Sequence, residues 1–177
     1  IKVRGMKKMF NKAKPLWMNL FFQKNIYVWF KSNLYIDKIP QSIKFRIIST
    51  VPYQLFCNTK FCGWGPWRGT KKLLWISEHN LTDILKKGDN EILLLMHYCG
   101  VPSGQRDSIE PWWMGEILVN DRVVLTSNQK KWSCQTGLNW KQNLYSSWYL
   151  RGFCEYYKVE KPGPNPFYSL KQKWEKP

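Results

Sequence analysis

The chain of 177 residues is within the range of one domain and is long enough to bury a substantial hydrophobic core. Its aromatic fraction of 16%, with eleven Trp, nine Tyr and nine Phe, excludes a disordered or low-complexity protein. The formal net charge of +16 comes mainly from lysines scattered through every segment, a pattern that indicates general solubility and predicts no specific nucleic-acid partner.

The first fourteen residues form a basic segment ahead of the predicted domain. The stretch IKVRGMKKMFNKAK, residues 1–14, holds six basic residues and no acidic one. It lacks the apolar centre and the small-residue cleavage site of a signal peptide, and no apolar run in the chain approaches the roughly 20 residues of a membrane span. We therefore expect no membrane partner and a cytoplasmic location.

The predicted domain, residues 15–160, begins with a series of short strands. The first two candidates are LWMNLFF and NIYVWFKSNLYI, and the second alternates in the way that a half-buried strand does. In the next candidate, SIKFRIIS, Ile43, Phe45 and Ile47 share one face while basic side chains take the other. These patterns predict strands that each bury one face.

Two hairpins are predicted from their turn residues. YQLFCNTKFCGWG is expected to turn at Asn58-Thr59-Lys60, because Asn tolerates the left-handed conformation that tight turns need. WMGEILVNDRVVLTS is expected to turn at Asn120-Asp121 for the same reason. Both segments therefore predict antiparallel strand pairs.

The stretch NLTDILKKGDNEILLLMHY predicts one helical turn followed by a strand. Either Asn80 or Thr82 can cap the turn, which then ends at Gly88. The residues from Ile92 to Met96 are apolar without interruption, which indicates a strand that is buried on both faces.

The remaining segments complete an all-β fold. KKLLWISEHN, NWKQNLYSSWYL and GFCEYYKV are further strand candidates, and residues 161–177 are rich in proline and predict an irregular arm. Neither an internal repeat nor a long helical period is present. The spacing of about eight to ten short strands predicts an antiparallel β-sandwich or jelly roll.

The acids and histidines do not predict a catalytic site. Glu110 and Glu116 flank two adjacent tryptophans and form the one pair with a glycosidase-like placement, but acids in loops beside aromatics are mostly solvated. His79 and His97 lack a companion Cys or Ser motif and are expected to be packed or surface histidines. We therefore expect no catalytic residue in this chain.

Neither a cofactor site nor a metal site is predicted. GWGPWRG lacks the ending of a phosphate-binding loop, and Pro66 removes one of the amides that such a loop needs. The five cysteines show no CxxC and no His at metal-ligand spacing. Cys57 and Cys62 lie on either side of a short turn, which leaves a disulfide open, although reduced buried thiols are the simpler expectation.

Tryptophans in or near loops are the binding candidates. An exposed indole offers a flat apolar face to a sugar or to another domain, whereas the alternative is that these rings fill the core. Trp64 and Trp67 lie in the Gly-Pro-rich stretch with Arg68, which would either lock loop carbonyls or reach a ligand. The adjacent Trp112 and Trp113 must point in opposite directions if extended, so at most one belongs to the core.

Several of these segments resemble one family of proteins. YQLFCNTKFCGWGPWRG, followed by HNLTDILKKGDNEILLLMHYCG, is similar to the N-terminal β-sandwich domain of bacterial α-L-rhamnosidases and related glycoside hydrolases. There a strand of the form Y-x-L-x-V-N-G-x-x-V-G-x-G-P-x-R-G precedes a segment D-L-T-x-x-L-x-x-G-x-N-x-I. The similarity extends in both directions and covers nearly the whole chain from about Trp17, although Thr59 stands where the family has Gly.

The resemblance implies a galactose-binding-like jelly roll that is a non-catalytic accessory domain of a bacterial rhamnosidase-like enzyme. The family's catalytic (α/α)-barrel is missing from this chain and would be its partner, in cis or as a separate chain. The alternative is a stand-alone lectin-like module that binds rhamnose-containing glycans. Trp64 and Trp67 would accordingly meet either a neighbouring domain or a sugar, and we favour the neighbouring domain.

Overall fold

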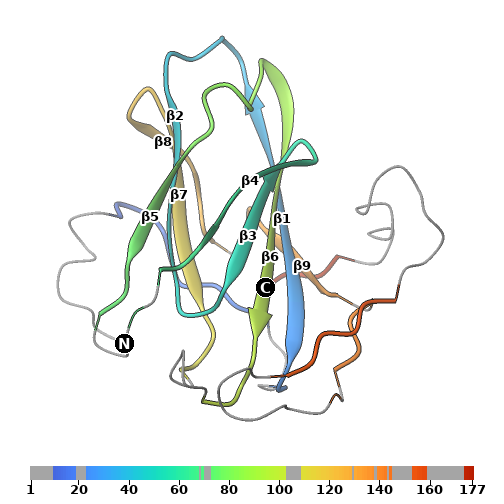
Figure 1. Ribbon diagram of the computed structural model, residues 1–177. Coiled ribbons are helices and arrows are strands. Elements are labelled where there is room, and N and C mark those ends of the chain that lie inside the picture. Colours follow the sequence, from blue (N-terminus) through green and yellow to red (C-terminus); the bar gives the residue numbers. More distant parts are fainter. Residues whose placement is uncertain are drawn as a thin grey trace.

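The computed structural model describes residues 10–18, 23–67, 69, 73–102, 109–128, 130–137, 139–142, 144, 153–158 and 174–177. These residues form two facing antiparallel sheets and no helix (Figure 1). The five-stranded sheet has the order β4-β3-β6-β1-β9, and the four-stranded sheet has the order β5-β2-β7-β8. The strands are β1 (Ile26–Ile36), β2 (Ile43–Ser49), β3 (Tyr53–Cys57), β4 (Lys60–Gly65), β5 (Ile76–Asn80), β6 (Gly88–Tyr98), β7 (Trp113–Val119), β8 (Arg122–Thr126) and β9 (Ser133–Thr136). The predicted antiparallel β-sandwich is confirmed.

The main core lies between the two sheets, where alternate residues of each long strand point inward. In β2, Ile43, Phe45 and Ile47 are buried while Lys44 and Arg46 are partly exposed, as the alternation predicted. The largest fully buried side chains are those of Trp113, Trp132, Phe30 and Phe45. Aromatic rings from both sheets therefore fill much of the space between them.

Strand β1 buries both of its faces in its first half. Phe30 packs in the main core, whereas Trp29 lies on the outer face and is nevertheless only 6% exposed. The ring centroid of Trp29 lies 5.9 Å from that of Phe56 and 6.4 Å from that of Trp140, so these rings cover it. The expectation of a half-buried strand is therefore wrong for this part of β1, because residues that follow β9 cover its outer face.

The residues before β1 extend the four-stranded sheet along β7. Leu16 and Trp113 exchange two backbone hydrogen bonds of 2.8 and 3.0 Å, and the amide of Lys14 donates to the carbonyl of Ser127 at 2.8 Å. Residues 16–18 make this single bridge and do not form the strand expected for LWMNLFF, whose residues 19–22 lie outside the described residues.

Both predicted hairpins are confirmed, and each turns over two residues with positive φ. Asn58 and Thr59 have φ values of 50° and 68°, and Asn120 and Asp121 have values of 48° and 61°. This left-handed pair is the geometry that matches the twist of the flanking strands. The first turn is one residue shorter than predicted, because Lys60 already belongs to β4.

The helical turn expected before β6 is present. The amide of Leu85 donates to the carbonyl of Leu81 at 3.0 Å, which closes one turn. The side-chain oxygen of Asn80 accepts from the amide of Thr82 at 3.0 Å, so Asn80 is the cap. Gly88 follows with a φ of 94° and begins β6.

The described residues after β9 form single bridges. Trp140 pairs with Tyr157, so the described parts of NWKQNLYSSWYL and GFCEYYKV contain no strand. Cys134 and Glu175 exchange backbone hydrogen bonds of 2.7 and 2.8 Å, which places Glu175 beside β9 at the edge of the five-stranded sheet. The division of the chain into residues 1–14, 15–160 and 161–177 stays a prediction, because most of the two outer segments lies outside the described residues.

The five cysteines are free thiols. Cys57 on β3 hydrogen-bonds to Cys62 on β4, and this bond raises the pKa of Cys57 and lowers that of Cys62. Burial also raises the pKa of Cys134 to about 12, with a smaller contribution from the charge of Glu175.

In the part of the chain that the structure describes, no helix has the length and hydrophobicity needed to cross a membrane.

Candidate functional site

The exposed tryptophans of the described residues lie on β4 and in the segment between β4 and β5. Trp64 is 60% exposed, Trp67 is 68% exposed and Trp75 is 48% exposed. The rings of Trp64 and Trp67 have their centroids 5.8 Å apart, and the chain turns between them at the cis Gly65–Pro66 peptide. We call Trp67 and Trp75 the tryptophan rim. The structure thus places two of the sequence candidates at the surface.

Two glycines of β4 hold this strand close to its neighbours. A Cβ on Gly63 would lie 2.6 Å from the Nδ1 atom of His79, and a Cβ on Gly65 would lie 2.6 Å from the hydroxyl of Tyr53. That hydroxyl lies 2.9 Å from the Nε2 atom of His79. A larger residue at either position would push β4 outward, so the two glycines position the strand that carries Trp64.

Burial governs the titration of the Tyr53–His79 pair. It raises the pKa of Tyr53 to about 12 and lowers the pKa of His79 below its usual value of 6.5. His79 on β5 is therefore neutral at neutral pH and packs against β3 and β4, as expected for a packed histidine. The pair closes the edge of the sandwich beneath the tryptophan rim.

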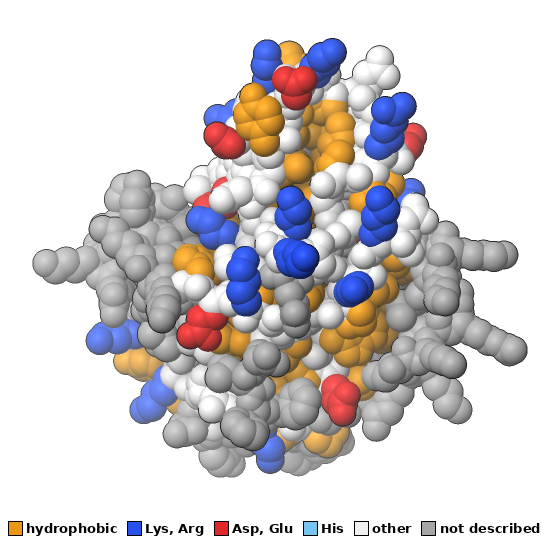
Figure 2. All heavy atoms as spheres, turned by 180° about the vertical axis from the view of Figure 1, so that it is seen from behind, with side chains coloured by type: hydrophobic (Ala, Val, Ile, Leu, Met, Phe, Trp, Pro, Cys, Tyr) orange, Lys and Arg blue, Asp and Glu red, His pale blue; other side chains and the backbone are white. Residues whose placement is uncertain are grey.

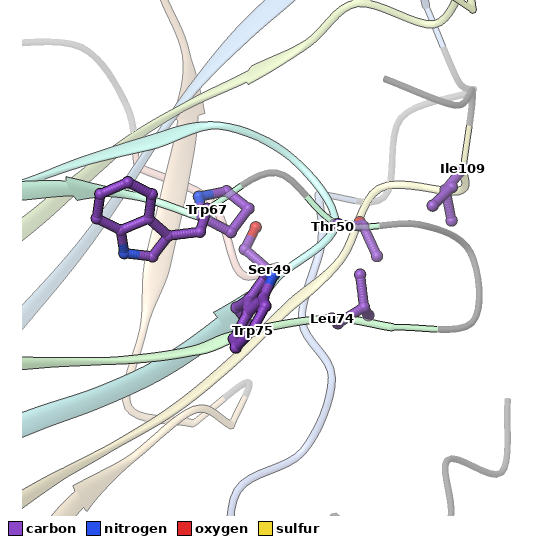
Figure 3. Close-up of a pocket in the computed structure, with 8 residues that line it drawn as sticks. Ser49, Thr50, Trp67, Leu74, Trp75 and Ile109 are labelled. Carbon is purple, nitrogen blue, oxygen red and sulfur yellow. The ribbon is translucent and has the colours of Figure 1, made fainter. Parts of the chain in front are cut away.

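A small hollow lies between Trp67 and Trp75 (Figure 3). The close-up shows Trp67 and Trp75 near Ser49, with Thr50 and Leu74 farther along. The hollow has a volume of about 20 Å³, which admits a water molecule and is far too small for a sugar. The two indoles therefore offer an apolar surface rather than a ligand pocket.

A larger hollow lies on the outer face of the five-stranded sheet and has a volume of about 340 Å³. Trp64 lines it from β4, and Trp140 lines it from the residues that follow β9. The strand register places Trp64, Gln54 and Leu95 in one row across β4, β3 and β6, and all three line the hollow. We call it the outer hollow. Its volume lies at the lower end of the range of small-molecule sites, about 300 to 1,000 Å³.

A column of four rings borders the outer hollow. His97 stacks on Tyr27 with centroids 4.2 Å apart, and Tyr27 stacks on Trp140 at 4.7 Å. Trp140 also contacts Tyr157 at 4.6 Å. His97 and Tyr27 are partners in the register of β6 and β1, so the sheet itself fixes the first pair. Stacking on Tyr27 and a tilted contact with Tyr157 hold the Trp140 ring in place.

The polar groups that line the outer hollow include Glu155, Gln54 and His97. One carboxylate oxygen of Glu155 accepts a hydrogen bond from the indole nitrogen of Trp140 at 2.9 Å. The pKa of the Tyr27 phenol is raised by burial first and by the charge of Glu155 second. The side chains of Glu155 and Gln54 are exposed, so they can also bond to a ligand.

The two acids considered as a glycosidase pair do not form one. Glu116 on β7 is 1% exposed, and one of its carboxylate oxygens accepts from the amides of Lys12 and Ala13 at 2.7 and 3.0 Å. Glu110 lies exposed before β7. A carboxylate buried beneath backbone cannot reach a bound sugar, so Glu116 anchors the residues before β1. Among the described residues, three or more potential metal ligands nowhere converge.

Trp112 and Trp113 point to opposite faces of the four-stranded sheet, as predicted, but both are buried. Trp113 lies in the main core, where its ring packs against Trp132 at 4.8 Å. Trp112 lies in a second cluster on the outer face, formed with Phe10, Ile48 and Met114. Neither is therefore a surface contact, because the residues before β1 cover the outer face of β7. Arg68 lies outside the described residues.

Sequence reasoning missed Glu155 and the ring column. Trp140 and Glu155 come from segments far from β1 in the sequence, and no turn or spacing indicates that they fold back over it. One signal was present: Tyr27 and Trp29 place large aromatic rings on the face of β1 opposite Val28. Two such rings on a supposedly exposed face indicate that other residues cover it.

Basic side chains are spread over the face of the molecule shown in Figure 2, with hydrophobic and acidic side chains between them. Glu78 pairs with Arg46 at 2.7 Å and with Lys44 at 3.6 Å, and the bond to Arg46 lowers the pKa of Glu78. Lys31 also pairs with Glu91.

Comparisons with known proteins identify the fold. No protein-family model matches the chain, and no curated protein matches it. Among solved structures it is similar to a GH78 family rhamnosidase of Bacillus sp. GL1, with a TM-score of 0.82 and 18% identity, over 94% of this chain and 18% of that chain. The α-L-rhamnosidase of Dictyoglumus thermophilum gives 0.56 and 16% identity, over 85% and 17% of the two chains.

The α-L-rhamnosidase of Aspergillus terreus also matches, with a TM-score of 0.53 and 16% identity, over 77% of this chain and 20% of that chain. The chain therefore spans about a fifth of the length of each of these enzymes. The structural similarity agrees with the resemblance stated from the sequence motifs. This chain has the β-sandwich fold of one part of the α-L-rhamnosidases.

Proposed function

We propose that the chain is a non-catalytic accessory β-sandwich of a rhamnosidase-like glycoside hydrolase and that it supports a catalytic (α/α)-barrel, in cis or on a separate chain. The observation that carries the proposal is the coverage: 94% of this chain matches only 18% of the Bacillus enzyme. The buried, backbone-bound carboxylate of Glu116 supports the absence of catalysis. A bacterial cytoplasmic location is part of the same proposal.

The tryptophan rim supports docking to another domain. Trp67 and Trp75 expose large apolar rings at one end of the sandwich, and the hollow between them is too small for a ligand. An exposed apolar patch on a soluble domain commonly marks a protein interface. Aromatic residues contribute strongly to such interfaces because they bury a large area with little loss of side-chain entropy.

A chimera tests the docking. The segment of the Bacillus enzyme that this chain matches is replaced by this chain, so that the linkage raises the effective concentration of a weak interface. We expect Trp67→Ala to lower the melting temperature of the chimera more than it lowers that of the isolated chain, because only the chimera contains the interface.

Ile39→Ala is the matched control. Ile39 is 84% exposed and lies in the connection between β1 and β2. Figure 1 shows this connection at the opposite end of the sandwich from the start of β5, which follows the tryptophan rim in the sequence. Its replacement should change the melting temperature of the chimera and that of the isolated chain by the same amount. Equal effects of Trp67→Ala in both proteins would contradict docking through the rim.

A further inference from the structure

We propose that the outer hollow binds an uncharged saccharide of one or two pyranose units, which stacks on Trp64 and hydrogen-bonds to Glu155 and Gln54. This inference goes beyond the accessory function and does not rest on the docking of a barrel. It uses Trp64 on the outer face of the five-stranded sheet, whereas the docking argument uses Trp67 and Trp75 at the end of the sandwich.

Trp64 supplies the stacking surface. Its ring is 60% exposed although it lines the outer hollow, so much of its surface is open to a ligand. The ring face of an indole carries a partial negative charge, which attracts the weakly positive C–H groups on the flat face of a pyranose. Trp140 stands in the stacked ring column and presents a rigid border to the same hollow.

Glu155 and Gln54 supply directional hydrogen bonds. Glu155 is held in place by the hydrogen bond from Trp140, which occupies only part of the acceptor capacity of its carboxylate. A carboxylate needs donors from a ligand, and an amide offers both donors and acceptors. Vicinal hydroxyl groups satisfy both requirements, whereas a purely apolar ligand would leave these groups without partners.

The charge of the hollow excludes anionic ligands. Although the chain has 28 Lys and Arg residues, none is among the described residues that line the outer hollow, and Glu155 gives it a negative charge. Phosphates, sulfates and acidic sugars would therefore be repelled. The carboxylate already accepts a hydrogen bond from Trp140, which disperses part of its charge and favours a hydroxyl group over a cation.

The volume sets the size of the ligand. About 340 Å³ lies at the lower end of the range for small-molecule sites, which fits one or two sugar units and not a long chain. Glu155 and Gln54 are both exposed, so the rest of a longer glycan would continue into solvent. The hollow therefore suits a chain end or a short branch.

Titration calorimetry of the intact chain tests the proposal with methyl α-L-rhamnopyranoside, methyl β-D-galactopyranoside and cellobiose, and an array of neutral glycans extends the panel. We expect at least one neutral saccharide to bind. Trp64→Ala and Glu155→Gln should each weaken that binding tenfold or more. Tyr35→Ala should leave it unchanged, because Tyr35 is an aromatic residue of similar exposure, 64%, on the distal part of β1.

Three outcomes would overturn the proposal. The first is the absence of binding across the calorimetric panel and the array. The second is binding that survives Trp64→Ala, which would place the sugar elsewhere. The third is tighter binding of a cation, choline, or of an acidic sugar, galacturonate, than of every neutral sugar. Trp67→Ala should retain saccharide binding, so a failure of barrel docking and a failure of this site are distinguishable. Circular dichroism of each variant establishes that it is folded.

Discussion

Two buried tryptophans of the core differ in one polar contact. The indole nitrogen of Trp132 donates to the carbonyl of Thr126 at 3.1 Å, whereas that of Trp113 has no hydrogen-bond partner among the described residues. The two rings pack edge to face and share the same apolar surroundings. A buried N–H without a partner reduces stability by about 1 to 3 kcal/mol, so Trp113 stabilises the fold through packing alone.

We predict that Trp113→Phe lowers the free energy of unfolding less than Trp132→Phe does. Both changes remove part of a large ring, but only the second breaks a buried hydrogen bond, and the difference should be about 1 kcal/mol. Urea unfolding followed by circular dichroism measures both variants against the wild type. Equal losses would show that the indole nitrogen of Trp113 has a partner in solution.

His79 makes stability depend on pH. Burial lowers its pKa, so the folded chain binds this proton less readily than the unfolded chain, whose value is near 6.5. The stabilisation is therefore complete above that pH and is lost as the pH falls through the lower pKa of the folded state. We predict that wild type loses more stability than His79→Gln between about pH 8 and about pH 5.

Urea titrations at several pH values measure this difference. Carboxylates titrate equally in both proteins. Subtracting the two profiles of unfolding free energy against pH therefore isolates the contribution of His79. Glutamine retains a polar group that can bond to the Tyr53 hydroxyl and so serves as a conservative replacement. Parallel profiles for wild type and His79→Gln would contradict the assignment of a lowered pKa to this residue.

At the scale of elements, the two hairpin turns have the same geometry and different residues. Thr59 adopts a φ of 68° and Asp121 a φ of 61°. Aspartate tolerates this region better than a β-branched residue does, because its side chain can bond to the local backbone. The β3–β4 turn therefore holds more strain than the β7–β8 turn.

We predict that Thr59→Gly raises the free energy of unfolding by about 1 kcal/mol, because glycine adopts positive φ without a steric penalty. Asp121→Gly is the matched control at the second turn and should give a smaller gain. Thermal and urea unfolding of the two variants provide the comparison. A gain for Asp121→Gly that equals or exceeds that of Thr59→Gly would show that strain at Thr59 is not the cause.

Local chemistry determined the elements that sequence analysis predicted well. The inward face of β2, both hairpin turns and the Asn80 cap follow from alternation and from residues with special backbone preferences. The burial of the outer faces of β1 and β7 did not follow from these local patterns. Phe10 covers Trp112, and Trp140 covers Trp29, through contacts between residues about a hundred positions apart. Periodicity along a strand carries no information about such covering segments.

The candidate site also has one part that the sequence predicted and one part that it did not. Trp64 and Trp67 were predicted from loop composition, and their exposure follows from the turn at Gly65–Pro66 and from the tight packing of Gly63 and Gly65. Glu155 could not be predicted, since its role depends on a ring column assembled from three separate segments.

At the scale of the whole molecule, the sandwich presents two different surfaces. The end of the sandwich carries Trp67 and Trp75 around a hollow of about 20 Å³, whereas the outer face beside Trp64 has a hollow of about 340 Å³. The first suits a protein partner and the second suits a small hydroxylated ligand. An accessory domain with both surfaces would hold an enzyme and a glycan at the same time, without supplying an acid or a base for hydrolysis.

The rate at which the purified chain hydrolyses para-nitrophenyl α-L-rhamnopyranoside tests this account most directly. We predict a rate equal to that of buffer alone, because Glu116 is bound to backbone and Glu110 has no carboxylate partner at a sugar site among the described residues. Turnover that rises in proportion to the protein concentration and disappears in Glu110→Gln would contradict the account.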